Sequence, residues 1–165
     1  MKRLVILCLE DEAEVREAVL RDLDPFKTMM RVEGCENAED ARHVLADCVA
    51  AQEEVALVLC DHLMPGQHGV DFLIDLHQDP RYQKTRKVLI TGQAGLEDTV
   101  RAVNGAQLHH YIAKPWNADE FQAAVRNQLT DYVIETQDDL MPFISVLDGP
   151  RILEKIASEK RHLKA

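Results

Sequence analysis

The chain has 165 residues and a formal net charge of −10, and 46% of its residues are hydrophobic. This length suits one ordinary domain with an extension and allows a substantial core. The acidic balance argues against direct binding to nucleic acid or to an anionic membrane surface. No apolar run of 18 residues predicts a membrane-spanning helix, so we expect no membrane insertion. Acidic residues end the first apolar run after Leu9 without a small-residue cleavage site, so we expect no signal peptide.

Cysteine and histidine usage indicates neither a disulfide framework nor a histidine metal site. Four cysteines occur without a CxxC spacing: Cys8, Cys35, Cys48 and Cys60. Two of them lie in apolar runs, where a free thiol packs as a small apolar group, and this usage is typical of the reducing cytoplasm. The seven histidines are scattered, and the adjacent His109 and His110 would face opposite sides of a strand.

Apolar runs alternate with amphipathic helical patterns along the first 128 residues. The predicted strands are residues 3–9, 29–35, 55–60, 87–91 and 108–113. The predicted helices are residues 13–23, 38–50, 70–78, 96–104 and a fifth that starts near Asn117. This order predicts βαβ units that form an all-parallel five-stranded sheet with helices on both faces.

Local signals refine several of these elements. Asn37 and Asn117 are predicted N-caps, and Glu120 gives the second a capping-box pattern. The less apolar strand at 29–35 is expected at a sheet edge, and Gly105 is expected to stop the fourth helix. Three apolar side chains are expected to anchor that helix: Leu96, Val100 and Val103.

The stretch VALVLCDHLMPG, residues 55–66, ends its apolar run at Asp61. Such a run predicts a strand buried on both faces, and open α/β sheets form their ligand crevice at the carboxyl ends of such strands. An isolated aspartate there could equally be a turn residue. However, other predicted strands also end in polar groups or glycine: Glu10, Asp11 and Glu12 after the first, Thr91 and Gly92 at the fourth, and Lys114 at the fifth. Since neighbouring parallel strands share this edge, these groups can converge.

Four of these stretches resemble the receiver domain of two-component response regulators. The matching motifs are LEDE, CDHLMPG, LITGQA and YIAKPW, in the family's order and at about its spacing. Each motif is weak alone, but four on the expected elements are specific. The resemblance covers residues 1–128 and implies a flavodoxin-like, doubly wound α/β fold for this phosphoacceptor domain.

The resemblance implies that Asp61 is the phosphoacceptor and that Lys114 and Thr91 assist it by contacting phosphoryl oxygens. Lys114 would precede a cis peptide bond to Pro115, and Gly92 would leave room for the phosphoryl group. For Thr91, a β-branched residue that simply favours a strand is the alternative.

Clustered carboxylates repel one another, and a divalent cation would offset their charge. Oxygen ligands favour Mg²⁺. By resemblance, Asp11, Asp61 and the backbone carbonyl of Leu63 ligate it, with Glu10 acting through a water. The family usually has aspartate at the place of Glu10, and the extra methylene puts the metal geometry in question.

By the same resemblance, Thr91 and Tyr111 form the switch that alters the surface of helix four, strand five and helix five. Alternation places Tyr111 on the opposite strand face from Ile112, and a buried tyrosine with a bonded hydroxyl is the alternative. Leu63 and Gln93 would flank the phosphoryl group and influence the attack of water, which the apolar Leu63 is expected to slow. Trp116 is expected to serve local packing or a partner surface rather than catalysis.

Residues 129–165 lie beyond the resemblance and predict a helical extension, for dimerisation or as a linker to an absent output domain. Asp148-Gly149-Pro150 predicts a turn, followed by a charged helix at residues 151–164. The apolar residues of the extension should fold back or pair with another chain, and a homodimer is expected. They are Leu129, Tyr132, Val133, Leu140, Phe143, Ile144, Val146 and Leu147.

The function expected from these features is a signalling switch. A histidine kinase or phosphotransfer protein would phosphorylate Asp61, and the altered face would control a downstream output protein or domain. The alternatives are a phosphorylation-independent interaction module, a truncated receiver of a multidomain regulator, and an aspartate-nucleophile phosphatase. The last would need a DxD pattern, whereas His62 and Leu63 follow Asp61. We therefore expect no enzyme, beyond slow self-dephosphorylation.

Overall fold

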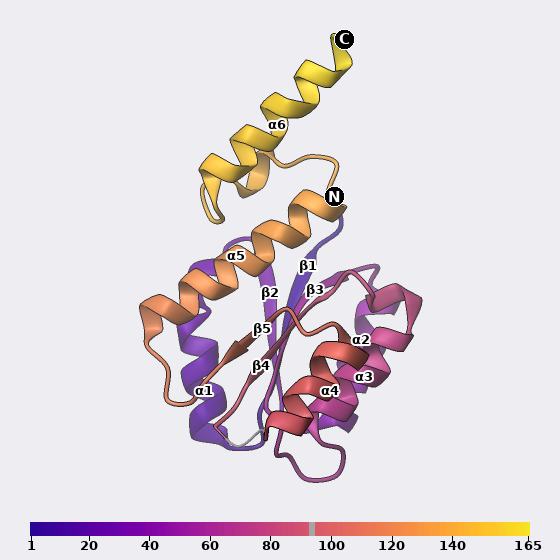
Figure 1. The fold of residues 1–165 in the computed structure, drawn as a ribbon, viewed down its shortest axis with the longest axis vertical. Helices are drawn as coiled ribbons and strands as arrows, with labels where there is room; N and C mark the ends of the chain where they lie inside the picture. Colours follow the sequence, from indigo (N-terminus) through magenta and orange to yellow (C-terminus); the bar gives the residue numbers. More distant parts are fainter. Residues whose placement is uncertain (93–94) are drawn as a thin grey trace.

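The computed structural model describes every residue except 93 and 94. Its five strands form one parallel sheet in the order β2-β1-β3-β4-β5 (Figure 1). The strands are β1 (Leu4–Leu9), β2 (Met30–Cys35), β3 (Glu54–Cys60), β4 (Arg86–Ile90) and β5 (His110–Ile112). This topology confirms the predicted flavodoxin-like fold class and the edge position of β2.

Helices cover both faces of the sheet. They are α1 (Ala13–Asp22), α2 (Ala38–Ala50), α3 (Gly69–Gln78), α4 (Leu96–Ala106), α5 (Ala118–Thr136) and α6 (Gly149–Leu163). Three short 3₁₀ segments join them: η1 (Asp24–Phe26), η2 (Pro80–Tyr82) and η3 (Met141–Phe143). In Figure 1, α1 and α5 lie on one face and α2, α3 and α4 on the other. None of the helices in the described part of the chain is long and apolar enough to span a membrane.

The two layers explain why β3 is apolar without interruption. Leu57 and Leu59 join the core under α1 and α5, while Val58 and Cys60 join the core under α2, α3 and α4. A strand covered on both faces buries every side chain, so alternation is lost. Asp61 ends this run and therefore lies at the carboxyl edge of the sheet.

Helix α4 differs from its prediction in two ways. It continues through Gly105 to Ala106, and its C-cap Gln107 has a φ of 51°, in the left-handed region. A Cβ on Gly105 would lie 3.1 Å from a side-chain carbon of Ile74, so this glycine allows close packing against α3. Small Ala102 and Ala106 make the buried face. The three expected anchors are therefore exposed instead: Leu96 (83%), Val100 and Val103.

The predicted turn at residues 148–150 is also wrong. Gly149 and Pro150 lie in the first turn of α6, and Asp148 is its N-cap, accepting a hydrogen bond from the Arg151 backbone N–H. Proline fits this first turn because its missing N–H would have no partner within the helix. Asn37 and Asn117 cap α2 and α5 as predicted.

The extension folds back onto its own domain, which is one of the two outcomes expected for its apolar residues, and the homodimer stays a prediction. η3 turns the chain after α5, and the apolar residues of the extension join the core that α1 and α5 cover. Arg126 Nε donates to the Val146 carbonyl at 3.2 Å, and the Asp148 N–H donates to Thr130 Oγ1 at 3.1 Å. The division expected at residue 128 falls inside α5. Fully or mostly buried are Leu129, Tyr132, Val133, Leu140, Phe143 and Leu147, and Ile144 and Val146 are partly buried.

Candidate functional site

The polar residues predicted at strand ends meet at one edge of the sheet. Glu10 and Asp11 follow β1, Asp61 follows β3, Thr91 follows β4 and Lys114 follows β5. Backbone bonds continue the sheet past the strand ends: the Asp61 N–H donates to the Leu9 carbonyl at 3.0 Å, and the Thr91 N–H to the Ile112 carbonyl at 3.1 Å. These bonds hold the backbone of Asp61 and of Thr91 in line with the sheet.

Lys114 joins two of the carboxylates. Its Nζ lies 2.6 Å from Glu10 Oε2 and 3.1 Å from Asp61 Oδ2. Glu10 and Asp61 are buried, and Asp11 is partly exposed beside them. Carboxylate oxygens of Glu10, Asp11 and Asp61 all lie within 4.8 Å of one another. The convergence that the strand order predicts is confirmed for these four side chains.

Burial and charge act against each other in this cluster. Burial, with a further contribution from the Asp61 charge, raises the pKa of Glu10, although the hydrogen bond from Lys114 opposes the change. Burial alone would lower the pKa of Lys114, but its hydrogen bonds to Glu10 and Asp61 outweigh that cost and raise the pKa. Lys114 is therefore held as a cation at neutral pH.

The donor set suits a hard divalent cation. Each of the three carboxylates offers an oxygen atom, these atoms lie within 4.8 Å of one another, and oxygen is the ligand that Mg²⁺ prefers. The partly exposed position of Asp11 leaves a path for the water ligands that Mg²⁺ retains. Leu63 follows on the same loop with its side chain 40% exposed, and the ligand role of its backbone carbonyl stays a prediction.

Thr91 and Tyr111 are in direct contact. Thr91 is buried, and Tyr111 Oη donates a hydrogen bond of 2.8 Å to the Thr91 backbone carbonyl. Tyr111 and Ile112 pack against opposite layers, which confirms the predicted alternation. The peptide bond between Lys114 and Pro115 is cis, as the motif implied. The predicted role of Gln93 lies outside the described residues.

A family model of the response regulator receiver domain matches residues 6–126. The chain belongs to the response regulator receiver family. The hydrogenase transcriptional regulatory protein HoxA of Cupriavidus necator is 33% identical over 125 residues, which cover 76% of this receiver and 24% of HoxA. HoxA of Bradyrhizobium diazoefficiens is 29% identical over 160 residues, covering 94% of the receiver chain and 30% of that protein.

The solved structures agree with this assignment. The signal receiver domain of an HD domain-containing protein from Pseudomonas fluorescens superposes with a TM-score of 0.72 at 25% identity, covering 84% of this chain and 96% of that one. The present chain spans less than a third of the length of the two HoxA relatives. The activity of those whole proteins can therefore be suggested for this receiver only as a proposal.

Sequence reasoning missed the placement of His62 in this receiver. Its ring is 2% exposed, and Nε2 lies 3.0 Å from Oδ2 of Asp98, which belongs to α4. The two residues are 36 positions apart, so only the tertiary fold reveals the pair. Trp116, in contrast, serves local packing as expected, since its Nε1 donates to Asp22 at 2.8 Å and its ring lies beside Phe121.

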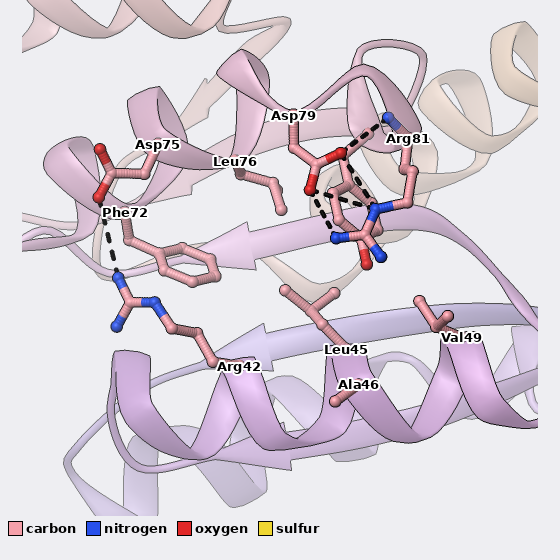
Figure 2. A pocket seen from close by; sticks show the side chains of 10 residues that line it. Arg42, Leu45, Ala46, Val49, Phe72, Asp75, Leu76, Asp79 and Arg81 are labelled. Atoms are coloured by element: carbon pink, nitrogen blue, oxygen red, sulfur yellow. Dashed lines mark hydrogen bonds and ion pairs between the residues drawn. The ribbon is translucent and has the colours of Figure 1, made fainter.

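A cavity of about 420 Å³ lies between α2 and α3, apart from the acidic cluster (Figure 2). Apolar side chains of both helices form its floor, and two charged pairs lie at its rim. Arg81 forms a hydrogen-bonded ion pair with Asp79, and Arg42 lies 3.8 Å from Asp75. None of the acidic-site residues lines this cavity.

Proposed function

We propose that this receiver accepts a phosphoryl group on Asp61 from a histidine kinase or phosphotransfer protein and thereby acts as a signalling switch. The observation that carries the proposal is the position of Lys114, whose ammonium bonds Asp61 and Glu10 at the same time. A buried carboxylate beside a fixed cation can take up a further negative group, because the cation offsets the added charge.

The transfer forms one bond and breaks one. A carboxylate oxygen of Asp61 attacks the phosphorus, the P–N bond of the donor phosphohistidine breaks, and the imidazole nitrogen keeps the electron pair and gains a proton from solvent. Lys114 holds a phosphoryl oxygen as a point charge, and the Thr91 hydroxyl bonds another. Mg²⁺ held by Asp11, Asp61 and the Leu63 carbonyl, with Glu10 acting through water, would offset the charge of carboxylates and phosphoryl oxygens.

The output of the switch is proposed to be the surface of α4, β5 and α5. Thr91 is tied to Tyr111 through its backbone carbonyl, so a displacement of Thr91 toward the phosphoryl group would also move β5. The exposed apolar side chains of α4 would give a partner its contact. Because the chain carries a net charge of −10, we propose an output through a protein partner or a further domain rather than direct nucleic-acid binding.

Phosphorylation with acetyl phosphate tests the assignment. Incubation with Mg²⁺ should add one phosphoryl mass by intact mass spectrometry. Asp61→Asn should abolish the addition, whereas Asp75→Asn, which changes an exposed carboxylate of α3, should retain it. Undiminished phosphorylation of Asp61→Asn would overturn the assignment. No reaction in the wild type would favour a phosphorylation-independent module, and sustained release of phosphate would favour an enzyme.

We propose second that the chain forms a homodimer. Because most apolar residues of the extension are buried within one chain, the proposed contact is limited to those that stay exposed. The exposed apolar side chains of the extension are Met141 (60%), Leu153 (51%) and Leu163. Sedimentation of the full chain at tens of micromolar, with and without beryllofluoride, should show a dimer that Leu153→Lys weakens. A monomer under both conditions would exclude this contact.

We also propose that the receiver works in the cytoplasm. Its four cysteines are all buried and free, and burial raises the pKa of the Cys35 thiol to about 12. Free thiols persist where the compartment is reducing.

A further inference from the structure

His62 contacts both the phosphoacceptor and α4. Its backbone N–H donates to Asp61 Oδ1 at 2.7 Å, while its ring nitrogen Nε2 lies 3.0 Å from Asp98 Oδ2. An ionised carboxylate only accepts hydrogen bonds, so Nε2 carries the proton that is shared with Asp98. One residue thus bonds the group that receives the phosphoryl and the helix that follows Thr91 in the chain.

The ring of His62 has little freedom to move independently. It is almost completely buried and packs edge-on against the ring of His68, with centroids 5.0 Å apart. Its other nitrogen, Nδ1, is buried and has no hydrogen-bond partner among the residues that the structure describes. Asp98 is therefore the polar group that fixes the ring, and without it neither ring nitrogen would have a hydrogen-bond partner among the described residues.

Asp98 in turn fixes the first turn of α4. Its Oδ1 accepts from Arg101 Nη1 at 3.2 Å, and Arg101 Nη2 bonds Asp71 of α3 at 2.5 Å. Asp98 and Arg101 are about half exposed or less, whereas the bond to His62 is made by a buried ring. A shielded, charge-assisted bond contributes more than an exposed ion pair, so the His62 contact is the stronger of the two tethers.

We infer that His62 is a positioning residue that couples the state of Asp61 to the position of α4 through Asp98. The inference rests on the proposed function and adds a connection that does not pass through Thr91 or Tyr111. When Asp61 becomes an acyl phosphate, its carboxylate loses charge, and the acceptor of the His62 N–H changes. The backbone of His62, which bonds Asp61 directly, would then shift, and the buried ring would transmit this shift to Asp98.

Linkage gives the direction of the effect. Because the displacement of His62 on phosphorylation would weaken its bond to Asp98, this bond favours the arrangement of α4 in which Asp61 carries no phosphoryl group. Coupling between two sites is reciprocal, and a tether that favours the resting state must weaken binding of a phosphoryl analogue. Removing the tether should therefore tighten beryllofluoride binding in the presence of Mg²⁺.

The test compares Asp98→Ala with Glu97→Ala in the full chain. Glu97 is the neighbouring acidic residue of the same first turn, so the control loses the same charge at the helix N-terminus. Asp98→Ala should tighten beryllofluoride binding roughly five- to tenfold, at the lower end of the usual range of allosteric coupling. Glu97→Ala should stay within about twofold. Without beryllofluoride, hydrogen exchange of the α4 amides should be faster in Asp98→Ala than in the control.

A double-mutant cycle separates His62 from Arg101 as the partner that matters. In a His62→Asn background, Asp98→Ala should change beryllofluoride affinity by less than about twofold, because the tether is already gone. An effect of Asp98→Ala that persists in this background, or equals that of Glu97→Ala, would overturn the coupling alone. Absence of beryllofluoride binding in the wild type would overturn the proposed function together with the coupling.

Discussion

Lys87 has a fully buried ammonium group at the opposite end of β4 from Thr91. Its Nζ donates to the carbonyl oxygens of Tyr82, at 2.8 Å, and Thr85, at 2.9 Å. Burial, with a smaller contribution from the Arg86 charge, lowers the pKa of Lys87 to about 8. The neutral carbonyls orient this cation but do not neutralise it.

The lowered pKa of Lys87 predicts that this residue makes folding more favourable as the pH rises. An unfolded lysine binds its proton up to about pH 10.4, so between pH 8 and that value the unfolded chain holds more protons than the native one. The charged form costs stability below pH 8, and this cost disappears as the native ammonium loses its proton. The free energy of unfolding should therefore gain about 2 kcal/mol from Lys87 between pH 8 and 9.5.

Urea unfolding of the wild type and of Lys87→Met at several pH values measures this contribution. Burial raises the pKa of all four native thiols, so in this range thiols ionise only in the unfolded chain. That effect is common to both proteins, so the difference between the two curves isolates Lys87. That difference should move in favour of the wild type as the pH rises. A difference that is constant from pH 7 to 9.5 would show that Lys87 is not charged and buried in the native state.

At the residue scale, the sequence predicts groups whose position follows from strand ends. Glu10 and Asp61 follow the buried strands β1 and β3, Lys114 follows β5, and a parallel sheet brings such ends together. Lys87 and the pair of His62 with Asp98 could not be found in this way. The sequence does not indicate that a lysine within a strand is buried, and the contact of His62 with Asp98 depends on where α4 packs.

At the scale of elements, the loop between β3 and α3 depends on Gly69. A Cβ at this position would lie 1.7 Å from the Asp61 carbonyl oxygen and 2.8 Å from Cys60 Sγ. The Gly69 N–H also donates to the His62 carbonyl at 2.8 Å. The first turn of α3 therefore lies directly against the backbone of the phosphoacceptor, and no side chain fits between them.

Gly69→Ala should destabilise the receiver and impair phosphorylation together. The added methyl forces the backbone of Asp61 to move, and such overpacking costs about 1 to 3 kcal/mol or more. Urea unfolding and the rate of acetyl phosphate labelling measure the two effects. Gly95→Ala is the control, since a Cβ there meets no atom of the described, non-adjacent residues within 4 Å, and it should cost less than about 1 kcal/mol. Equal stability and equal labelling of both variants would contradict the steric argument.

The strands and helices that could be predicted from the sequence are those whose burial leaves a clear pattern of apolar residues. Parallel strands covered on both faces must be apolar throughout, so β1 and β3 are evident from the sequence. The inward face of α4 was not, because it consists of Ala102, Gly105 and Ala106 packed closely on α3. Apolar periodicity favours the larger side chains, and in α4 these lie on the exposed face.

At the scale of the whole molecule, the extension and the receiver share one core. Phe143 is 1% exposed and belongs to the same cluster as Phe26 and Val133. Arg151 Nη2 lies 2.5 Å from Asp131 of α5, which fastens the start of α6 as well. The family model stops at residue 126, yet the packing does not stop there. The family model covers the part of the chain that carries the site, whereas the core also includes the apolar residues of the extension.

This shared core predicts that a cavity in the extension destabilises the whole receiver. Phe143→Ala should lower the free energy of unfolding by about 3 to 5 kcal/mol, as for a phenylalanine in any core. The single tryptophan, Trp116, lies in the receiver part against Phe121 and bonds Asp22, so its fluorescence reports that part. Urea unfolding followed by Trp116 fluorescence and by far-ultraviolet circular dichroism should give coincident transitions, both shifted to lower urea in the variant. Met141→Ala, at an exposed position two residues earlier, should change the stability by about 0.5 kcal/mol or less. If Phe143→Ala left the Trp116 transition at the wild-type midpoint while part of the dichroism was lost, the extension would unfold on its own and the single core would be disproved.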